Sequence, residues 1–182
     1  MMERGKIMAN IEVRLSTGSA VSTNVDSPNN SLGGKMAETA SGSAKAIIEE
    51  GSFLMNSIWD NITQLDNVAG ESDYRCIYIY NNATGPKPGP IIGTKFYISG
   101  TTYARFKAGA VDQKNKDAGV IRNEKEEPLG VLMESRTKDS PIVLGTLNPG
   151  DFHAIWLKRT PVNVSGAGEI RESFDFVIKG SE

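Results

Sequence analysis

One long stretch near the start of the chain lacks the side chains from which a protein core is built. Residues 16–45 read STGSAVSTNVDSPNNSLGGKMAETASGSAK, contain no aromatic residue and are dominated by small and polar side chains. Such a segment buries too little apolar surface to offset the entropy that is lost when it orders. We therefore expect an extended arm that orders against something else, which makes partner binding the first functional hypothesis.

The arm follows a short strand that should belong to the folded body. Residues 9–15 alternate between apolar and polar side chains, which predicts a half-buried strand. The predicted partner-binding residues are the apolar face of this strand and the apolar and glycine positions of the arm: Ile11, Val13, Leu15, Val21, Val25, Leu32, Gly33, Gly34 and Met36. The glycine pair at 33–34 is where the arm is expected to bend or insert.

After the arm, most of the pattern is that of short strands. Apolar runs bounded by turn residues predict strands at 74–80, 95–99, 103–107, 129–134, 141–144, 152–158 and 174–178. Apolar residues at three- and four-residue spacing predict one short helix within 47–62, which an edge strand at 46–48 could precede. The sequence Asn-Pro-Gly-Asp at 148–151 predicts a type II turn.

These signals together predict a mainly β protein. Seven to eight short strands with frequent turns favour an antiparallel, immunoglobulin-like β-sandwich with one short helix and a long extended N-terminal arm. We expect residues 1–45 to form the N-terminal strand and arm, and residues 46–182 to form the sandwich domain. At 182 residues the chain is long enough for one such domain.

Composition disfavours several classes of partner. The net charge is −2 and the 20 basic residues are scattered, which is not the pattern of a nucleic-acid-binding surface. No stretch approaches the length of apolar sequence that a membrane-spanning helix needs, and the first residues do not resemble a secretory signal. The chain is therefore predicted to be made in a cytoplasm and to stay soluble, with Met8 as an alternative start to Met1.

The residues that usually carry catalysis are scarce. The chain has one cysteine and one histidine, which excludes an internal disulfide and a zinc site built from several such ligands. Cys76 lies in an apolar run and is predicted to be a buried strand residue. His153 lies in a predicted strand and is expected to be structural or at the surface. We therefore predict no catalytic residue, no cofactor and no metal ion.

Three further patterns resemble sites but fit simpler interpretations better. The loop at 112–119 has lysines where a calcium loop needs ligands, so a solvated loop is expected. The acidic run at 124–127 is expected to be a hydrated connection. The aromatic residues suit core packing better than a sugar-binding face, which remains the alternative: Tyr78, Tyr80, Tyr97, Tyr103 and Trp156.

Five short motifs suggest a family. They are Ile-Glu-Val-Arg-Leu-Ser-x-Gly at 11–18, Ser-Leu-Gly-Gly at 31–34, Trp-Asp-Asn-Ile at 59–62, Asp-Tyr-Arg-Cys-Ile-Tyr-Ile at 73–79 and Trp-Leu-Lys-Arg-Thr at 156–160. In these motifs the chain resembles a group of small tailed-bacteriophage virion proteins. The resemblance implies a β-sandwich structural component of the capsid, neck or tail. Residues 1–7 and 85–90 fall outside it.

The resemblance and the arm lead to one functional expectation. The protein should be a non-enzymatic virion component that is made in the host cytoplasm, forms homo-oligomers in the particle and binds other virion proteins through its sandwich and arm. An arm of 30 residues can span up to roughly 100 Å when extended, enough to reach a neighbouring subunit. The alternative is a carbohydrate- or receptor-binding sandwich that uses exposed tyrosines.

Overall fold

The computed structural model describes residues 11–19, 31–38, 45–46, 51–53, 58–59, 70–84, 88–99, 105–161 and 175–181. The elements of this part of the chain are β1 (Ile11–Leu15), β2 (Lys45–Ala46), β3 (Gly51–Phe53), β4 (Asp73–Asn81), β5 (Ile91–Ser99), β6 (Phe106–Ala110), β7 (Ile142–Leu147), β8 (Phe152–Arg159) and β9 (Asp175–Ser181). The mainly β character that the sequence predicts is confirmed.

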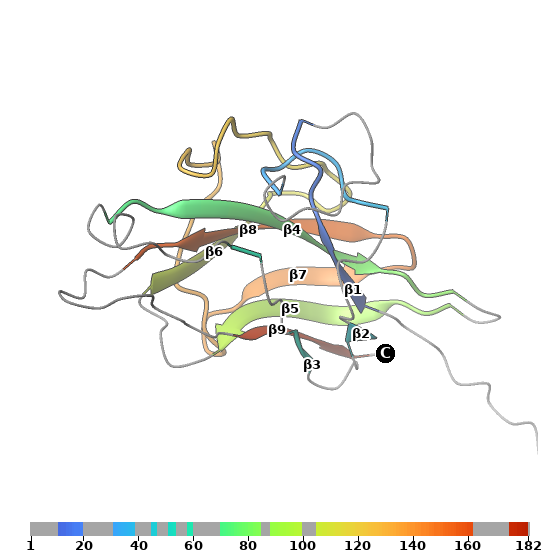
Figure 1. The fold of residues 1–182 in the computed structure, drawn as a ribbon. Helices are drawn as coiled ribbons and strands as arrows, with labels where there is room; N and C mark the ends of the chain where they lie inside the picture. Colours follow the sequence, from blue (N-terminus) through green and yellow to red (C-terminus); the bar gives the residue numbers. More distant parts are fainter. Residues whose placement is uncertain are drawn as a thin grey trace, which may run out of the picture.

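The strands form two antiparallel sheets. The five-stranded sheet has the order β2-β1-β4-β8-β6, and the four-stranded sheet has the order β3-β9-β5-β7. In Figure 1 the two sheets lie one above the other, and the upper side of β4 and β8 carries a further layer of non-strand chain. The five-stranded sheet therefore has an inner face toward the other sheet and an outer face under this layer.

The inner face follows from the alternation of side chains along β4 and β8. Ile77 pairs with Ile155, and both side chains are fully buried. They belong to an apolar cluster that also contains Phe96 and Leu147 of the four-stranded sheet. Each fully buried side chain of this kind contributes about 1.5–3 kcal/mol of transfer free energy, so this cluster is the main core.

The outer face of the same two strands is apolar as well. Cys76 and Tyr78 of β4 and Trp156 of β8 are fully buried in a second cluster. The prediction that residues 74–80 form a central strand, apolar on both faces, is confirmed. The second cluster is covered by residues 111–136, which we call the excursion, and by residues 31–37, which we call the strap.

One element prediction does not hold, and another falls mostly outside the described residues. In the region of the expected helix, residues 51–53 form β3 and residues 58–59 lie in a bend, while most of the rest of 47–62 lies outside the described residues. The strand expected at 129–134 is not formed, because this segment packs across the outer face and forms a β-bridge to the sheet only between Glu134 and Ala108. An apolar segment that packs across the face of a sheet has the same composition as one that forms a strand within it.

Other local predictions fit well. The strands expected at 74–80, 141–144, 152–158 and 174–178 correspond to β4, β7, β8 and β9. In the turn at 148–151 the amide of Asp151 donates to Asn148, and Gly150 has a φ of +88°, as a type II turn requires. β1 pairs with β4 in the body of the protein, and the division at residue 45 stays a prediction.

Candidate functional site

The strap is the part of the arm region that the structure describes most fully, and it is hydrogen-bonded like an added strand. On one side its backbone meets residues 16–18. The amide of Gly18 donates to the carbonyl of Gly33 at 2.7 Å, and the amide of Thr17 donates to the carbonyl of Lys35 at 2.9 Å. These bonds tie the strap to the chain that continues from β1.

On its other side the strap meets the excursion. The amide of Gly34 donates to the carbonyl of Ala118, and the amide of Ile121 donates to the carbonyl of Leu32, both at 3.0 Å. The strap thus lies between two segments that are about a hundred residues apart in sequence. Figure 1 shows this layer above the five-stranded sheet, with the strap in light blue.

The floor under the strap consists of β4 and β8. The amide of Cys76 donates to the carbonyl of Ser31 at 2.7 Å, and the Ser31 hydroxyl donates back to the carbonyl of Cys76. The Tyr78 hydroxyl donates to the carbonyl of Gly34 and accepts from the amide of Ala118 at 2.9 Å. One tyrosine therefore connects the strap, the excursion and the sheet. We call the surfaces that hold the strap (residues 16–18, 76–78 and 118–121) the seat.

The two glycines of the strap fit the seat so closely that no side chain has room. Gly33 and Gly34 have φ values of +86° and +81°, in the left-handed region that favours glycine. A Cβ on Gly33 would overlap the carbonyl of Gly119, and a Cβ on Gly34 would overlap the carbonyl of Gly18. The bend expected at this glycine pair is present, and the insertion is into the protein's own outer face.

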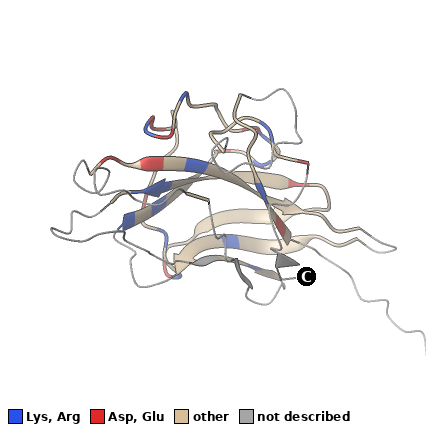
Figure 2. Ribbon diagram, in the orientation of Figure 1, with Lys and Arg blue, Asp and Glu red and all other residues tan. Residues whose placement is uncertain are grey.

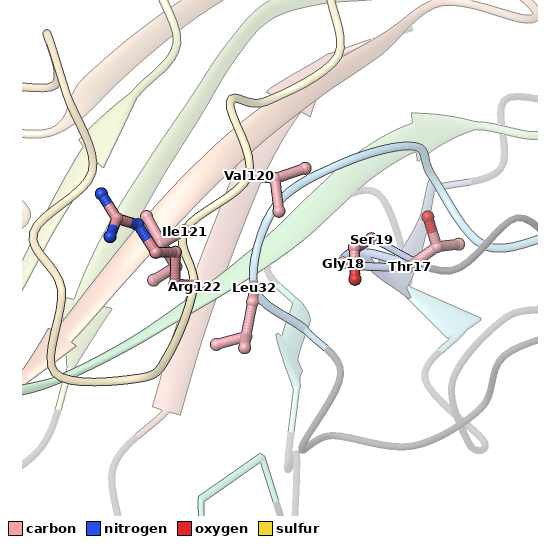
Figure 3. Close-up of a pocket in the computed structure, with 7 residues that line it drawn as sticks. All are labelled: Thr17, Gly18, Ser19, Leu32, Val120, Ile121 and Arg122. Atoms are coloured by element: carbon pink, nitrogen blue, oxygen red, sulfur yellow. The ribbon is translucent and has the colours of Figure 1, made fainter.

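A groove lies beside the strap (Figure 3). It has a volume of about 350 Å³, with residues 17–19 on one side, residues 120–122 on the other and Leu32 between them. The Thr17 hydroxyl is buried and has no hydrogen-bond partner among the described residues. The Arg122 side chain is 90% exposed. The groove therefore has both apolar and hydrogen-bonding walls.

Ion pairs fix the middle of the excursion to the sheet. Asp73 is 3% exposed and pairs with Arg159 at 2.6 Å and with Lys125 at 2.5 Å. Arg75 is 1% exposed and pairs with Glu124. The expectation of a merely hydrated connection at 124–127 is therefore wrong for its first two residues, since their partners are buried charges that sequence reasoning did not connect to them.

A second group of charged contacts holds the loop at 112–117, which is exposed as expected. The Asp151 carboxylate accepts from Lys114 Nζ and from Asn115 Nδ2, both at 2.7 Å. Although desolvation opposes ionisation, these bonds and the Asn148 amide hold the pKa of Asp151 at about 2. The loop is thus solvated and at the same time tied to the turn before β8.

The titratable groups near the seat are unsuited to proton transfer or nucleophilic attack near neutral pH. Burial raises the pKa of the Cys76 thiol far above its ordinary value, so the group stays protonated. Burial also raises the pKa of Tyr78, despite the hydrogen bond from Ala118. Burial lowers the pKa of His153, which therefore stays neutral in β8. What the seat can do is hold an extended backbone.

The predicted partner-binding residues fall into two groups on opposite faces of the sheet. Ile11, Val13 and Leu15 are at most 2% exposed and belong to the inner core. The strap positions Leu32, Gly33, Gly34 and Met36 lie on the outer face, with Gly33 buried and the other three half-buried. Val21 and Val25 lie outside the described residues. These residues therefore do not form one continuous free surface.

The sequence analysis missed the seat itself. Ser16 and Ser31 are fully buried, and the Ser16 hydroxyl accepts from the amide of Gly33 at 3.0 Å. Ala118 and Gly119 looked like part of a solvated loop, yet Ala118 is 4% exposed. The adjacent glycines were the signal for a close backbone approach, but nothing in the sequence identifies what they approach.

The aromatic residues proposed for a sugar-binding face are mostly buried. Tyr78 and Trp156 are fully buried, Tyr97 is 9% exposed, and Tyr80 is half-buried under the guanidinium of Arg14 at 4.3 Å. Tyr103 lies outside the described residues. Tyr78, Tyr97 and Trp156 are thus buried, as the preferred interpretation expected, and the ring of Tyr80 is covered by Arg14.

Charge and metal-binding groups add no further site. Figure 2 shows that both basic and acidic residues are distributed over the strands and the loops. Within the described ranges, no three histidine, cysteine, aspartate or glutamate side chains gather where they could hold a metal ion. Nor does any described helix have the length and apolar character needed to cross a membrane.

No protein-family model matches the sequence, and no curated protein matches it either.

Proposed function

We propose that this protein is a non-enzymatic structural component of a bacteriophage virion, acting as a capsid decoration, neck or tail accessory protein. It binds neighbouring virion subunits through its sandwich and its N-terminal arm after synthesis in the host cytoplasm. An immunoglobulin-like character of the sandwich and a homo-oligomeric state in the particle are parts of this proposal. The resemblance of the five sequence motifs to virion proteins is its starting point.

The observation that best supports the proposal is the convergence of four of these motifs at the strap. The first contributes residues 16–18, the second contributes residues 31–34, the fourth contributes residues 76–78, and the fifth contributes Trp156. What these segments share is a close fit around the strap backbone, made by the small residues of the first two motifs and by the Tyr78 hydroxyl and Trp156 ring beneath them. Motifs of this kind maintain the shape of the protein, whereas the motifs of an enzyme would bring acids, bases or nucleophiles together.

The excursion offers a surface for such contacts. Val120, Leu129 and Leu132 are 52%, 100% and 70% exposed, although the excursion is fixed by backbone bonds and ion pairs. Large apolar side chains held on a fixed scaffold are typical of residues that become buried against a partner. Val120 also belongs to the wall of the groove beside the strap.

The test is the presence of the chain in particles. Phage particles from the source of this sequence should be purified by density gradient and analysed by quantitative mass spectrometry. The proposal predicts a fixed copy number relative to the major capsid protein. A chain that is abundant in the lysate but absent from purified particles contradicts it.

A pair of variants then tests the surface. Leu129→Asp with Leu132→Asp should reduce incorporation into particles at least tenfold while leaving the unfolding transition nearly unchanged. Val143→Asp is the matched control, because Val143 is 67% exposed but lies on β7 of the other sheet. Equal incorporation of both variants would exclude the excursion as the contact surface.

A further inference from the structure

We propose that the seat is a strand-binding site that accepts the strap of a second copy of this chain, so that neighbouring copies exchange straps. This inference rests on the proposed function, whose neighbouring subunits it identifies in part as copies of the chain itself. The occupant is defined by the structure, because the seat is already complementary to one sequence, that of residues 31–37.

The first argument is the kind of contact that holds the strap. Its neighbours bind it mainly through backbone amides and carbonyls on both sides, with the Tyr78 hydroxyl bonded to the carbonyl of Gly34. Main-chain pairing of this kind is how proteins add a strand from another polypeptide. The contacts are made by the strap and the seat alone, so they are the same whether the strap comes from the same copy or from another.

The second argument is that an empty seat is costly. Without a strap, the amides of Cys76, Thr17 and Gly18 would lose their partners. Water can replace the strap as their partner, so each lost hydrogen bond costs about 0.5–1.5 kcal/mol. A copy that gives up its strap is therefore stabilised by taking another one. Reciprocal exchange between two copies keeps every seat filled, as in domain-swapped dimers.

The third argument is the length of chain on either side of the strap. Residues 20–30 precede it and residues 39–44 separate it from β2. Fully extended, these connections span at most about 40 Å and about 25 Å. The shorter connection sets the limit, so exchange requires the neighbour's seat to lie within about 25 Å of β2 in the copy that donates the strap. Copies packed side by side in a particle meet that condition and have a high effective concentration.

A disulfide across the strap provides the test. Ser16 and Met36 form an antiparallel bridge whose flanking hydrogen bonds run from Thr17 to Lys35 and from Ala37 to Leu15. This is the non-hydrogen-bonded type of pair, with Cα atoms about 4.5 Å apart, which a disulfide can span. All variants carry Cys76→Ala, because the Cys76 thiol lies beside the Ser16 hydroxyl.

The geometry is checked first in one chain. The double variant Ser16→Cys/Met36→Cys, oxidised at low concentration, should form an intramolecular disulfide and run as a monomer on a non-reducing gel. Its formation also shows that both substitutions are compatible with a seated strap. The decisive sample mixes the two single variants, Ser16→Cys and Met36→Cys, at high concentration before oxidation.

Exchange predicts a disulfide-linked heterodimer in this mixture, at least five times more abundant than in a control mixture of Met36→Cys with Ser140→Cys. Ser140 is exposed and makes its backbone bond outside the seat. A heterodimer no more abundant than in the control, while the double variant closes within one chain, overturns the exchange.

The result of the disulfide experiment can be distinguished from the result of the particle experiment that tests the proposed function. Particles that contain the chain but yield no linked heterodimer would retain the virion role without exchange. A linked heterodimer from a chain that is absent from particles would retain exchange and remove the virion role.

Discussion

The inner and outer faces of the five-stranded sheet are both buried, but they are covered by different kinds of structure. The inner face packs against aliphatic and aromatic side chains of the second sheet. The outer face packs Tyr78 and Trp156 under a strap of small residues whose position is set by backbone hydrogen bonds. The inner core therefore depends on side-chain volume, whereas the strap depends on backbone geometry. The following variants test that difference.

The largest effect is expected at Gly33. Gly33→Ala combines a left-handed φ with an overlap against Gly119, so it should lower the free energy of unfolding by about 4 kcal/mol. Gly130→Ala is the matched control, because Gly130 has a φ of +74° and open space around its Cβ position. It should cost about 1 kcal/mol. Urea unfolding of both variants measures the contrast, and equal losses would contradict a tight strap.

The inner core should respond to volume instead. Leu157 is fully buried in the core between the sheets, so Leu157→Ala should cost about 3 kcal/mol. Leu157→Met nearly conserves volume and should cost about 1 kcal/mol. The same urea experiment measures both. If Leu157→Met cost as much as Leu157→Ala, shape rather than volume would govern this core too.

A smaller effect is expected from one hydroxyl. Tyr78→Phe removes the group that bonds to Gly34 and Ala118, leaving buried backbone groups unpaired, and should cost about 2 kcal/mol. Tyr80→Phe, on the same strand but half-buried, should change stability by less than about 0.5 kcal/mol. A Tyr78→Phe chain as stable as the wild type would mean that the hydroxyl does not hold the strap.

The smallest effect concerns the loop that is tied by charge. The pKa of Asp151 is about 2 in the folded state and near 3.8 when unfolded, so its stabilisation is present above pH 4 and is lost as the pH falls toward 2. The loss should be on the order of 1 kcal/mol. Asp151→Asn should remove this acid-dependent component, while Asp139→Asn, at an exposed position, should keep it. Urea unfolding at pH 4.5 and pH 2.5 compares them.

The sequence predicts the strands well because their signal is local. The alternation of Phe152, Ala154 and Trp156 with the residues between them is enough to identify β8 and its two faces. Most of the segment with helical spacing, residues 54–62, lies outside the described residues, so the helix stays a prediction there; just before it, residues 51–53 form β3, which pairs with β9.

The strap seat could not be predicted because it depends on contacts distant in sequence. Gly33 meets Gly119, and Ser31 meets Cys76, across separations that only the completed sheet brings together. The same holds for Asp73, whose buried carboxylate finds Lys125 and Arg159. Low hydrophobicity at 16–45 predicts a segment without its own core, and in its described part, residues 31–37, the segment packs on the sheet. The low hydrophobicity did not indicate that the sheet supplies a core.

Amide hydrogen exchange of the isolated wild-type chain tests the central claim most directly. The amides of Gly18, Gly34 and Cys76 hold the strap in its seat. The account predicts that they exchange nearly as slowly as the amide of Ile155 in β8, and that Gly33→Ala accelerates the first two at least a hundredfold while Ile155 stays slow. Exchange of Gly18 and Gly34 in the wild type as fast as in an exposed loop would contradict a seated strap.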